Sequence, residues 1–178
     1  MSRTAKDADD FLDILRARHR VIMSGRPSIR PGMFKTHDNR AGETHFVHVD
    51  CVRGTLKKGF DMARALRHPF ARALFMLFMT SEVHPFEDGN GRISRLMMNA
   101  ELVSSGQAKI LVPTVFRPDY IGALRRLSRN RDPGVLLAAM NRLRDFSRRL
   151  ACDSFEAARR QLEAANAFSD DEGEILRF

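Results

Sequence analysis

The feature of this sequence that most constrains its fold is a short polar stretch between two apolar runs. The stretch, residues 84–92, reads His-Pro-Phe-Glu-Asp-Gly-Asn-Gly-Arg and is called the motif loop below. Residues 70–79 before it and residues 93–102 after it are rich in apolar side chains and have a helix-like pattern. A connection between two buried helices has little structural reason to carry so many polar groups. We therefore expect a helix–loop–helix core whose loop carries the chemistry.

The residue types in the motif loop point to phosphoryl or nucleotidyl chemistry. Gly89 and Gly91 let the backbone turn and let a ligand approach closely, and the helix that follows presents free N–H groups to an anion. Arg92 offers a fork that suits phosphate oxygens. Asp88 is a hard oxygen ligand suited to Mg²⁺ held jointly with phosphates, and His84 accepts a proton near neutral pH. Together these groups indicate transfer of a phosphorus group to a hydroxyl.

Two neighbouring residues extend the predicted phosphate site. Asn90 adds a side-chain amide donor, and Arg95 follows Arg92 at i+3, on the same helix face. Other residues of the stretch have simpler interpretations. Phe86 is expected to pack in the core, and Glu87 is expected to be a solvated loop residue.

Residues 84–95 read H-P-F-E-D-G-N-G-R-I-S-R. They resemble the signature of the Fic (Fido) family, H-x-F-x-[D/E]-G-N-G-R-x-x-R, at every fixed position. The resemblance implies a protein adenylyltransferase, which transfers AMP from the co-substrate ATP to a Ser, Thr or Tyr hydroxyl of a target protein. It implies that His84 is the general base, that Asp88 binds Mg²⁺ or Mn²⁺, and that Phe86 anchors the loop. The residues implied to bind the nucleotide phosphates are Gly89, Asn90, Gly91, Arg92 and Arg95.

Alternative functions exist on the same fold. In the family that this chain resembles, Gly at the position of Gly91 is found mostly in AMP transferases, whereas Lys there marks a phosphotransferase branch. Other nucleotidyl transferases and a phosphocholine transferase remain alternatives. A second hypothesis is that the chain is a basic helical binding module, for nucleic acid or an antitoxin-like partner, with a degenerate site. The presence of His84, Asp88 and Arg92 favours the enzyme.

A β-hairpin is expected upstream of the motif loop. Residues 33–36 and 44–47 predict two short strands, and residues 38–42 supply turn residues between them. The preceding Pro-Gly-x-Phe-Lys segment resembles the approach to the flap of Fic proteins, so we call residues 33–48 the flap. The resemblance implies that a protein substrate binds along the flap by strand pairing. Candidate target contacts are Lys35, Thr36 and Phe46.

The rest of the chain predicts an all-α domain of six or seven helices with one small β-hairpin. We expect a single domain over residues 1–178, with the Fic-like core at about 26–150 and an acidic tail at 170–174. Tyr120 lies in a segment that resembles the one whose Tyr touches the adenine side of the nucleotide, although a partly buried helix-start residue fits equally well. The helices are expected at 7–23, 50–66, 69–83, 92–105, 118–129, 133–150 and 153–168, with Asp50 as a helix N-cap.

Composition bounds the partners and the compartment. The net charge of +8 is spread along the 178 residues, and the chain has no zinc-ligand spacing, so nucleic acid is not the expected partner. Only two cysteines, Cys51 and Cys152, occur, which favours a reduced, cytoplasmic protein, with delivery into another cell left open. No apolar stretch reaches membrane-spanning length, so no membrane partner is expected.

Regulation is expected to come from a separate protein. Many Fic proteins carry an inhibitory helix of the form [S/T]-x-x-x-E-[G/N], whose Glu pairs with the second Arg of the signature. The nearest match in this sequence, residues 169–173 with Glu172, is one residue short between Ser and Glu. We therefore expect an antitoxin-like inhibitor rather than strong self-inhibition.

Overall fold

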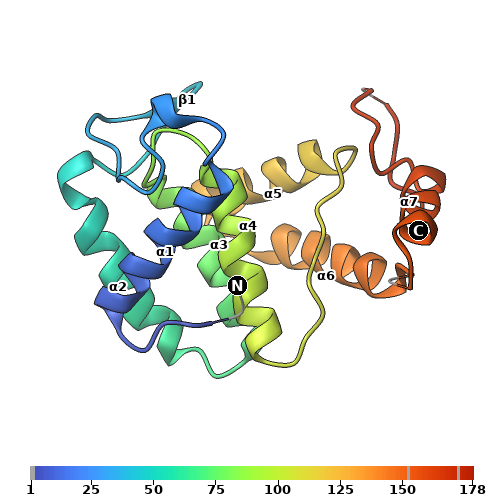
Figure 1. Cartoon of the computed structure of the whole chain (residues 1–178), viewed down its shortest axis with the longest axis horizontal. Coiled ribbons are helices and arrows are strands. Elements are labelled where there is room, and N and C mark those ends of the chain that lie inside the picture. Colours follow the sequence, from blue (N-terminus) through green and yellow to red (C-terminus); the bar gives the residue numbers. More distant parts are fainter. Residues whose placement is uncertain (1–2, 152, 172) are drawn as a thin grey trace. The chain divides into compact units, whose positions relative to one another are not determined.

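The computed structural model describes residues 3–151, 153–171 and 173–178. These residues form seven α-helices, two 3₁₀ turns and one two-stranded sheet, which confirms the predicted all-α fold with a small hairpin. The chain divides into two compact units, Met1–Gln107 and Ala108–Phe178 (Figure 1). That residues 1–178 act as a single domain stays a prediction. None of the helices in the described part of the chain has the length and apolar character needed to cross a bilayer.

The first unit is a bundle of four helices, α1 (Ala8–Ile22), α2 (Val52–Ala65), α3 (Pro69–Val83) and α4 (Asn90–Ser104). Helix α3 packs against α4 and α2, and α1 packs against α2 and α4 (Figure 1). Each helix contributes one apolar face because its apolar residues recur at helical spacing. The fully buried large side chains of this unit include Phe11, Leu15, Leu56, Met76, Leu77, Phe86, Ile93, Met98 and Leu102.

Helices α3 and α4 follow the predicted boundaries closely. Helix α3 begins at Pro69 and ends at Val83, as predicted, because a proline suits the first helical position. Helix α4 begins at Asn90, two residues before the predicted start, because Gly89 is its N-cap. The prediction that Asp50 is the N-cap of α2 is wrong. Asp50 lies in the 3₁₀ turn η2 (Val49–Cys51) that precedes this helix.

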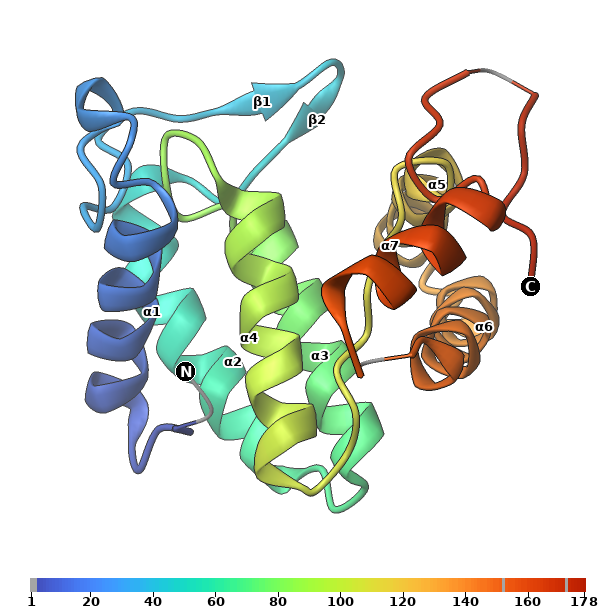
Figure 2. The ribbon, with the colours of Figure 1, turned by 45° about the vertical axis from the view of Figure 1, so that its right-hand side comes forward.

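The hairpin has shorter strands than predicted, and its first strand falls within the segment predicted as the turn. Strands β1 (Arg40–Ala41) and β2 (Thr44–His45) pair antiparallel, with Arg40 opposite His45 and Ala41 opposite Thr44. The predicted first strand at 33–36 is wrong. The Lys35 N–H instead donates to the Pro85 carbonyl oxygen at 2.8 Å, so the motif loop holds this segment in place of a neighbouring strand. Figure 2 shows the hairpin at the end of the first unit where α4 begins.

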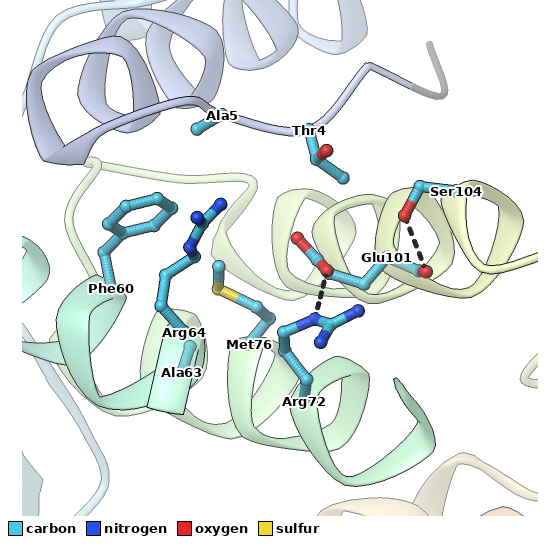
Figure 3. A pocket seen from close by; sticks show the side chains of 9 residues that line it. All are labelled: Thr4, Ala5, Phe60, Ala63, Arg64, Arg72, Met76, Glu101 and Ser104. Carbon is cyan, nitrogen blue, oxygen red and sulfur yellow. Dashed lines mark hydrogen bonds and ion pairs between the residues drawn. The ribbon is translucent and has the colours of Figure 1, made fainter. Parts of the chain in front are cut away.

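The opposite end of the first unit holds a cavity of about 290 Å³ (Figure 3). The Arg72 Nε donates to the Glu101 carboxylate at 2.9 Å across its floor, which ties α3 to α4. Arg72 also donates to the Leu66 carbonyl at 3.2 Å and to the Ser105 hydroxyl at 3.4 Å. The guanidinium therefore links α3 to α4 and to the end of α2.

The second unit contains α5 (Arg117–Asn130), α6 (Gly134–Arg149) and α7 (Phe155–Ala164), and α5 packs against α6. Ser154 caps α7 by accepting from the Ala157 N–H at 3.1 Å. The helix ends at Ala164 rather than at the predicted residue 168, and the chain turns there. Cys152 and Glu172, which the sequence analysis singles out, lie outside the described residues.

Candidate active site

The motif loop is closed on itself by one amide side chain. The Asn90 Oδ1 accepts from the Phe86 N–H at 3.0 Å, and the Asn90 Nδ2 donates to the Phe86 carbonyl at 2.8 Å. Asn90 is only 2% exposed, and Phe86 is fully buried, as expected of an anchor. The expectation that the Asn90 amide binds a phosphate is therefore not met in this structure, because both ends of that amide hold the loop. The backbone N–H of Asn90 remains a candidate donor.

The N-terminus of α4 opens directly from this loop. Gly89 is the N-cap, in the left-handed region at φ 78°, and no side chain caps the helix. The backbone N–H groups of Asn90 and Gly91 therefore lie at the uncapped positive end of α4, which is a ready anion site. The Ser94 hydroxyl is buried and donates to the Gly91 carbonyl at 3.0 Å, so its hydrogen bond is made within α4.

His84 ends α3 in an unusual backbone conformation. Its φ of 48° lies in the left-handed region, which non-glycine residues seldom adopt and which is enriched at functional sites. The carbonyl of Ser81 lies 3.1 Å from the imidazole Nδ1. A carbonyl only accepts, so Nδ1 carries the proton and the neutral ring keeps a lone pair on Nε2. Burial lowers the pKa of His84 below its usual value, which favours this neutral form near pH 7.

One residue of the flap covers the imidazole. The Phe46 ring stacks on the His84 ring with centroids 3.7 Å apart and planes at 11°. The stacked ring covers one face of the imidazole, and burial is the main cause that lowers the pKa of His84. Phe46, predicted as a target contact, therefore contacts the candidate base itself.

Asp88 lies beside the helix N-terminus with its carboxylate between two arginines. The Gly89 N–H donates to Asp88 Oδ1 at 2.6 Å, and Arg26 forms an ion pair with Oδ2. The Arg92 Nη2 lies 3.8 Å from the same oxygen. Among the described residues no group of three or more His, Cys, Asp or Glu side chains gathers for a metal. A single carboxylate is the kind of hard oxygen ligand that Mg²⁺ shared with nucleotide phosphates would use, and in this structure it is paired with Arg26.

Further arginines surround the loop. Arg30 forms an ion pair with Glu87 and donates to the Thr36 hydroxyl at 2.8 Å, so Glu87 is paired rather than only solvated. A Cβ built at Gly91 would lie 3.5 Å from the Arg95 Nη1, which places that guanidinium near the start of α4. Neither an ion pair nor a side-chain hydrogen bond links Arg95 to another residue in the described part of the chain.

The flap contacts are only partly as expected. Lys35 is 4% exposed, and its Nζ donates to the Asn39 Oδ1 at 2.7 Å and to the Val47 carbonyl at 2.6 Å. The expectation that Lys35 contacts a target is wrong, because its ammonium is buried and paired within the flap. Thr36 is exposed. Tyr120 lies on α5 in the second unit and is buried, so its adenine contact stays a prediction.

Besides Arg26 and Arg30, two residues that contact the motif loop were not predicted from the sequence. The Asn39 Nδ2 donates to the Phe86 carbonyl at 3.0 Å, which ties the flap to the motif loop. His19 stacks on Phe86, with centroids 3.7 Å apart, and contacts the Asp88 carbonyl. The sequence carries a signal for His19, since it falls on the apolar face of α1, four residues after the buried Leu15. Nothing local distinguishes Asn39 from an ordinary turn residue.

Comparisons with known proteins identify the family of this chain. The Fic/DOC family matches residues 10–102. A protein named "Protein adenylyltransferase fic-1" from Caenorhabditis elegans is 26% identical over 174 residues, which is 95% of this chain and 32% of the relative. A "Protein adenylyltransferase Fic" from Drosophila persimilis is 38% identical over 58 residues, or 33% of this chain and 11% of the relative. The chain thus spans about a third or less of these curated relatives.

Solved structures share the fold. Fic-1 (aa134–508) from C. elegans aligns with a TM-score of 0.66 at 21% identity, covering 87% of this chain and 44% of that one. A Fic domain containing signaling protein from Bacteroides thetaiotaomicron aligns with a TM-score of 0.64 at 21% identity, covering 92% and 66%. These similarities support the arrangement of the helices around the motif loop.

Proposed function

Because this chain belongs to the Fic/DOC family, we propose that it is a protein adenylyltransferase. It transfers AMP from ATP to a Ser, Thr or Tyr hydroxyl of a target protein and releases pyrophosphate. The observation that carries the proposal is the neutral form of His84. Its Nδ1 donates to the Ser81 carbonyl, and burial lowers its pKa. A neutral imidazole with its Nε2 lone pair available is what a general base for a hydroxyl needs.

In the proposed reaction His84 accepts the hydroxyl proton as the oxygen attacks the α-phosphorus of ATP. A bond forms between that oxygen and phosphorus, and the bond to the pyrophosphate oxygen breaks. His84 is then protonated, and the AMP is joined to the target. His84 ends α3 and lies six residues before the first helical residue of α4, which supports a base close to the proposed anion site.

The charge on the triphosphate is met by the start of α4. The N–H groups of Asn90 and Gly91 and the guanidinium groups of Arg92 and Arg95 are the proposed donors. Donors that are fixed before the reaction stabilise charge as it develops on the leaving pyrophosphate. Asp88 would hold Mg²⁺ or Mn²⁺, which would supply further charge neutralisation at the phosphates.

The target is proposed to bind along the flap. Strands β1 and β2 are short, and an added strand reads main chain rather than particular side chains. Among the residues predicted for target binding, Thr36 is exposed and Phe46 lies against the candidate base. Tyr120 on the adenine and a separate antitoxin-like inhibitor remain predictions.

The test compares ATP labelled at the α-phosphate with ATP labelled at the γ-phosphate, incubated with the purified chain and a cell lysate. We expect only the α-label to appear on protein. His84→Ala and His84→Asn should lower the rate by on the order of 10²–10⁴-fold. The Asn variant is included because Asn tolerates the left-handed backbone conformation of this position. His68→Ala is the matched control, since His68 is exposed and precedes α3 rather than ending it.

Transfer of the γ-label by the wild type would move the protein to the phosphotransferase alternative. Unchanged labelling by both His84 variants would show that the proposed base is not the base. Absence of any labelling, together with no measurable ATP binding, would favour the binding-module alternative.

A further inference from the structure

We propose that His19 is a positioning residue that fixes the peptide bond between Asp88 and Gly89. This peptide joins the candidate metal ligand to the N-cap of the helix that would hold the phosphates. The proposal rests on the proposed function for its catalytic consequence. The geometry of the contact itself is independent of that function.

His19 lies in the last turn of α1 and is fully buried. Both ring nitrogens have backbone partners. The Gly32 N–H donates to Nδ1 at 2.9 Å, and Nε2 lies 2.9 Å from the Asp88 carbonyl oxygen. An N–H only donates and a carbonyl only accepts, so these partners select one neutral tautomer, with its proton on Nε2. The ring thus hydrogen-bonds to one backbone donor and one backbone acceptor, each from a different loop.

The flat face of the ring supports the same loop. The His19 and Phe86 rings are stacked, with centroids 3.7 Å apart and planes at 3°. The loop backbone also packs directly on the imidazole edge, because a Cβ built at Gly89 would lie 3.2 Å from the His19 Nε2. His19 therefore contacts the motif loop through stacking, through a hydrogen bond and through close backbone approach.

The peptide that His19 holds has a particular role in the loop. Its carbonyl belongs to Asp88, and its N–H belongs to Gly89 and donates to the Asp88 carboxylate at 2.6 Å. Rotation of this peptide would move that carboxylate and change the direction of the first N–H groups of α4. The motif loop already has its own clamp at Phe86 and Asn90. His19 adds a constraint at the next peptides, which that clamp does not bond.

A purely structural role would depend on the burial of the ring and not on which nitrogen bonds which loop. Two amide substitutions separate these possibilities. In His19→Gln the amide nitrogen is as many bonds from Cβ as Nε2 is, so it can donate to the Asp88 carbonyl. In His19→Asn the amide oxygen matches Nδ1, so it can accept from Gly32 but cannot reach Asp88. Both variants lose the stacked ring.

The experiment measures three quantities on wild type, His19→Gln and His19→Asn in the full chain. The first is the free energy of unfolding by urea, which should fall by similar amounts in both variants. The second is amide hydrogen exchange at Gly89 in the absence of ATP, which should be faster in His19→Asn than in His19→Gln. The third is kcat for AMP transfer, which should fall on the order of 10²-fold in His19→Asn and recover most of that loss in His19→Gln.

Equal exchange at Gly89 in the two variants would overturn the proposal, as would equal losses of kcat that follow the losses of stability. If the wild type transfers no AMP, the proposed function fails. The exchange comparison still decides whether His19 holds the peptide.

Discussion

Substituting Gly89 by alanine tests how tightly the start of α4 is built into the first unit. Gly89 has φ 78°, and a Cβ there would lie 2.7 Å from the Met23 Sδ and 3.2 Å from the His19 Nε2. The substitution therefore has two separate penalties. One is the left-handed backbone conformation, and the other is overlap with buried side chains.

The two penalties can be given magnitudes. A non-glycine residue in the left-handed region costs roughly 1–2 kcal/mol. Overpacking in a dense core typically costs about 1–3 kcal/mol. The Met23 side chain is flexible and relieves part of the overlap, but His19 cannot shift without loosening its hydrogen bond to Asp88. We expect Gly89→Ala to lower the free energy of unfolding by roughly 2–5 kcal/mol.

The assay is urea unfolding followed by circular dichroism, with Gly106→Ala as the matched control. Gly106 also has a positive φ, 71°, but a Cβ there would meet nothing within 4 Å. The control should therefore lose only the backbone penalty, roughly 1–2 kcal/mol. If Gly89→Ala is no more destabilising than Gly106→Ala, the packing described around the N-cap is wrong.

Three further predictions concern the site. Phe46→Ala should uncover the His84 imidazole and raise its pKa toward the usual value, which shifts the acid limb of the pH–rate profile to higher pH. The control Phe46→Tyr keeps the stacked ring and should leave the acid limb at the same pH. Arg26→Ala should lower the Mg²⁺ concentration for half-maximal activity by about 2- to 5-fold, since exposed ion pairs are worth up to about 1 kcal/mol, and Arg30→Ala, whose partner is Glu87, should not. Burial lowers the pKa of His19 and His84 in the folded chain, so on acidification the unfolded chain takes up these protons at a higher pH than the folded chain does. The free energy of unfolding should therefore keep its full contribution from these histidines above pH 6.5 and fall as the pH drops below it. A urea midpoint that rises on acidification from pH 7 to 5.5 would contradict this.

Local sequence information was sufficient for the helices around the motif. Proline at position 69 and the apolar run behind it define α3, and the predicted start of α4 lies within two residues of the observed one at Asn90. The residue types of the motif loop also predict an anion site at a helix N-terminus, and α4 begins there without a capping side chain. These features depend on contacts between residues that are close in the sequence.

Features that depend on distant contacts could not be predicted in the same way. Residues 33–36 have the composition of a strand, but Lys35 bonds the Pro85 carbonyl, 50 positions along the chain, and buries its ammonium. Asn90 looks like a phosphate donor in the sequence, and only the structure shows its amide bound to Phe86. The partners of His19 come from two loops that the sequence does not place together.

The amide clamp between Asn90 and Phe86 has a consequence for the thermodynamics of nucleotide binding. Both hydrogen bonds are made within the protein alone, so the loop has its shape before a ligand arrives. Ordering a flexible backbone costs roughly 1–2 kcal/mol per residue in conformational entropy at room temperature. A nucleotide that meets this loop does not have to order those residues, and more of its interaction energy remains for affinity. Asn90→Ala should therefore weaken ATP binding mainly through a less favourable binding entropy, which titration calorimetry would resolve.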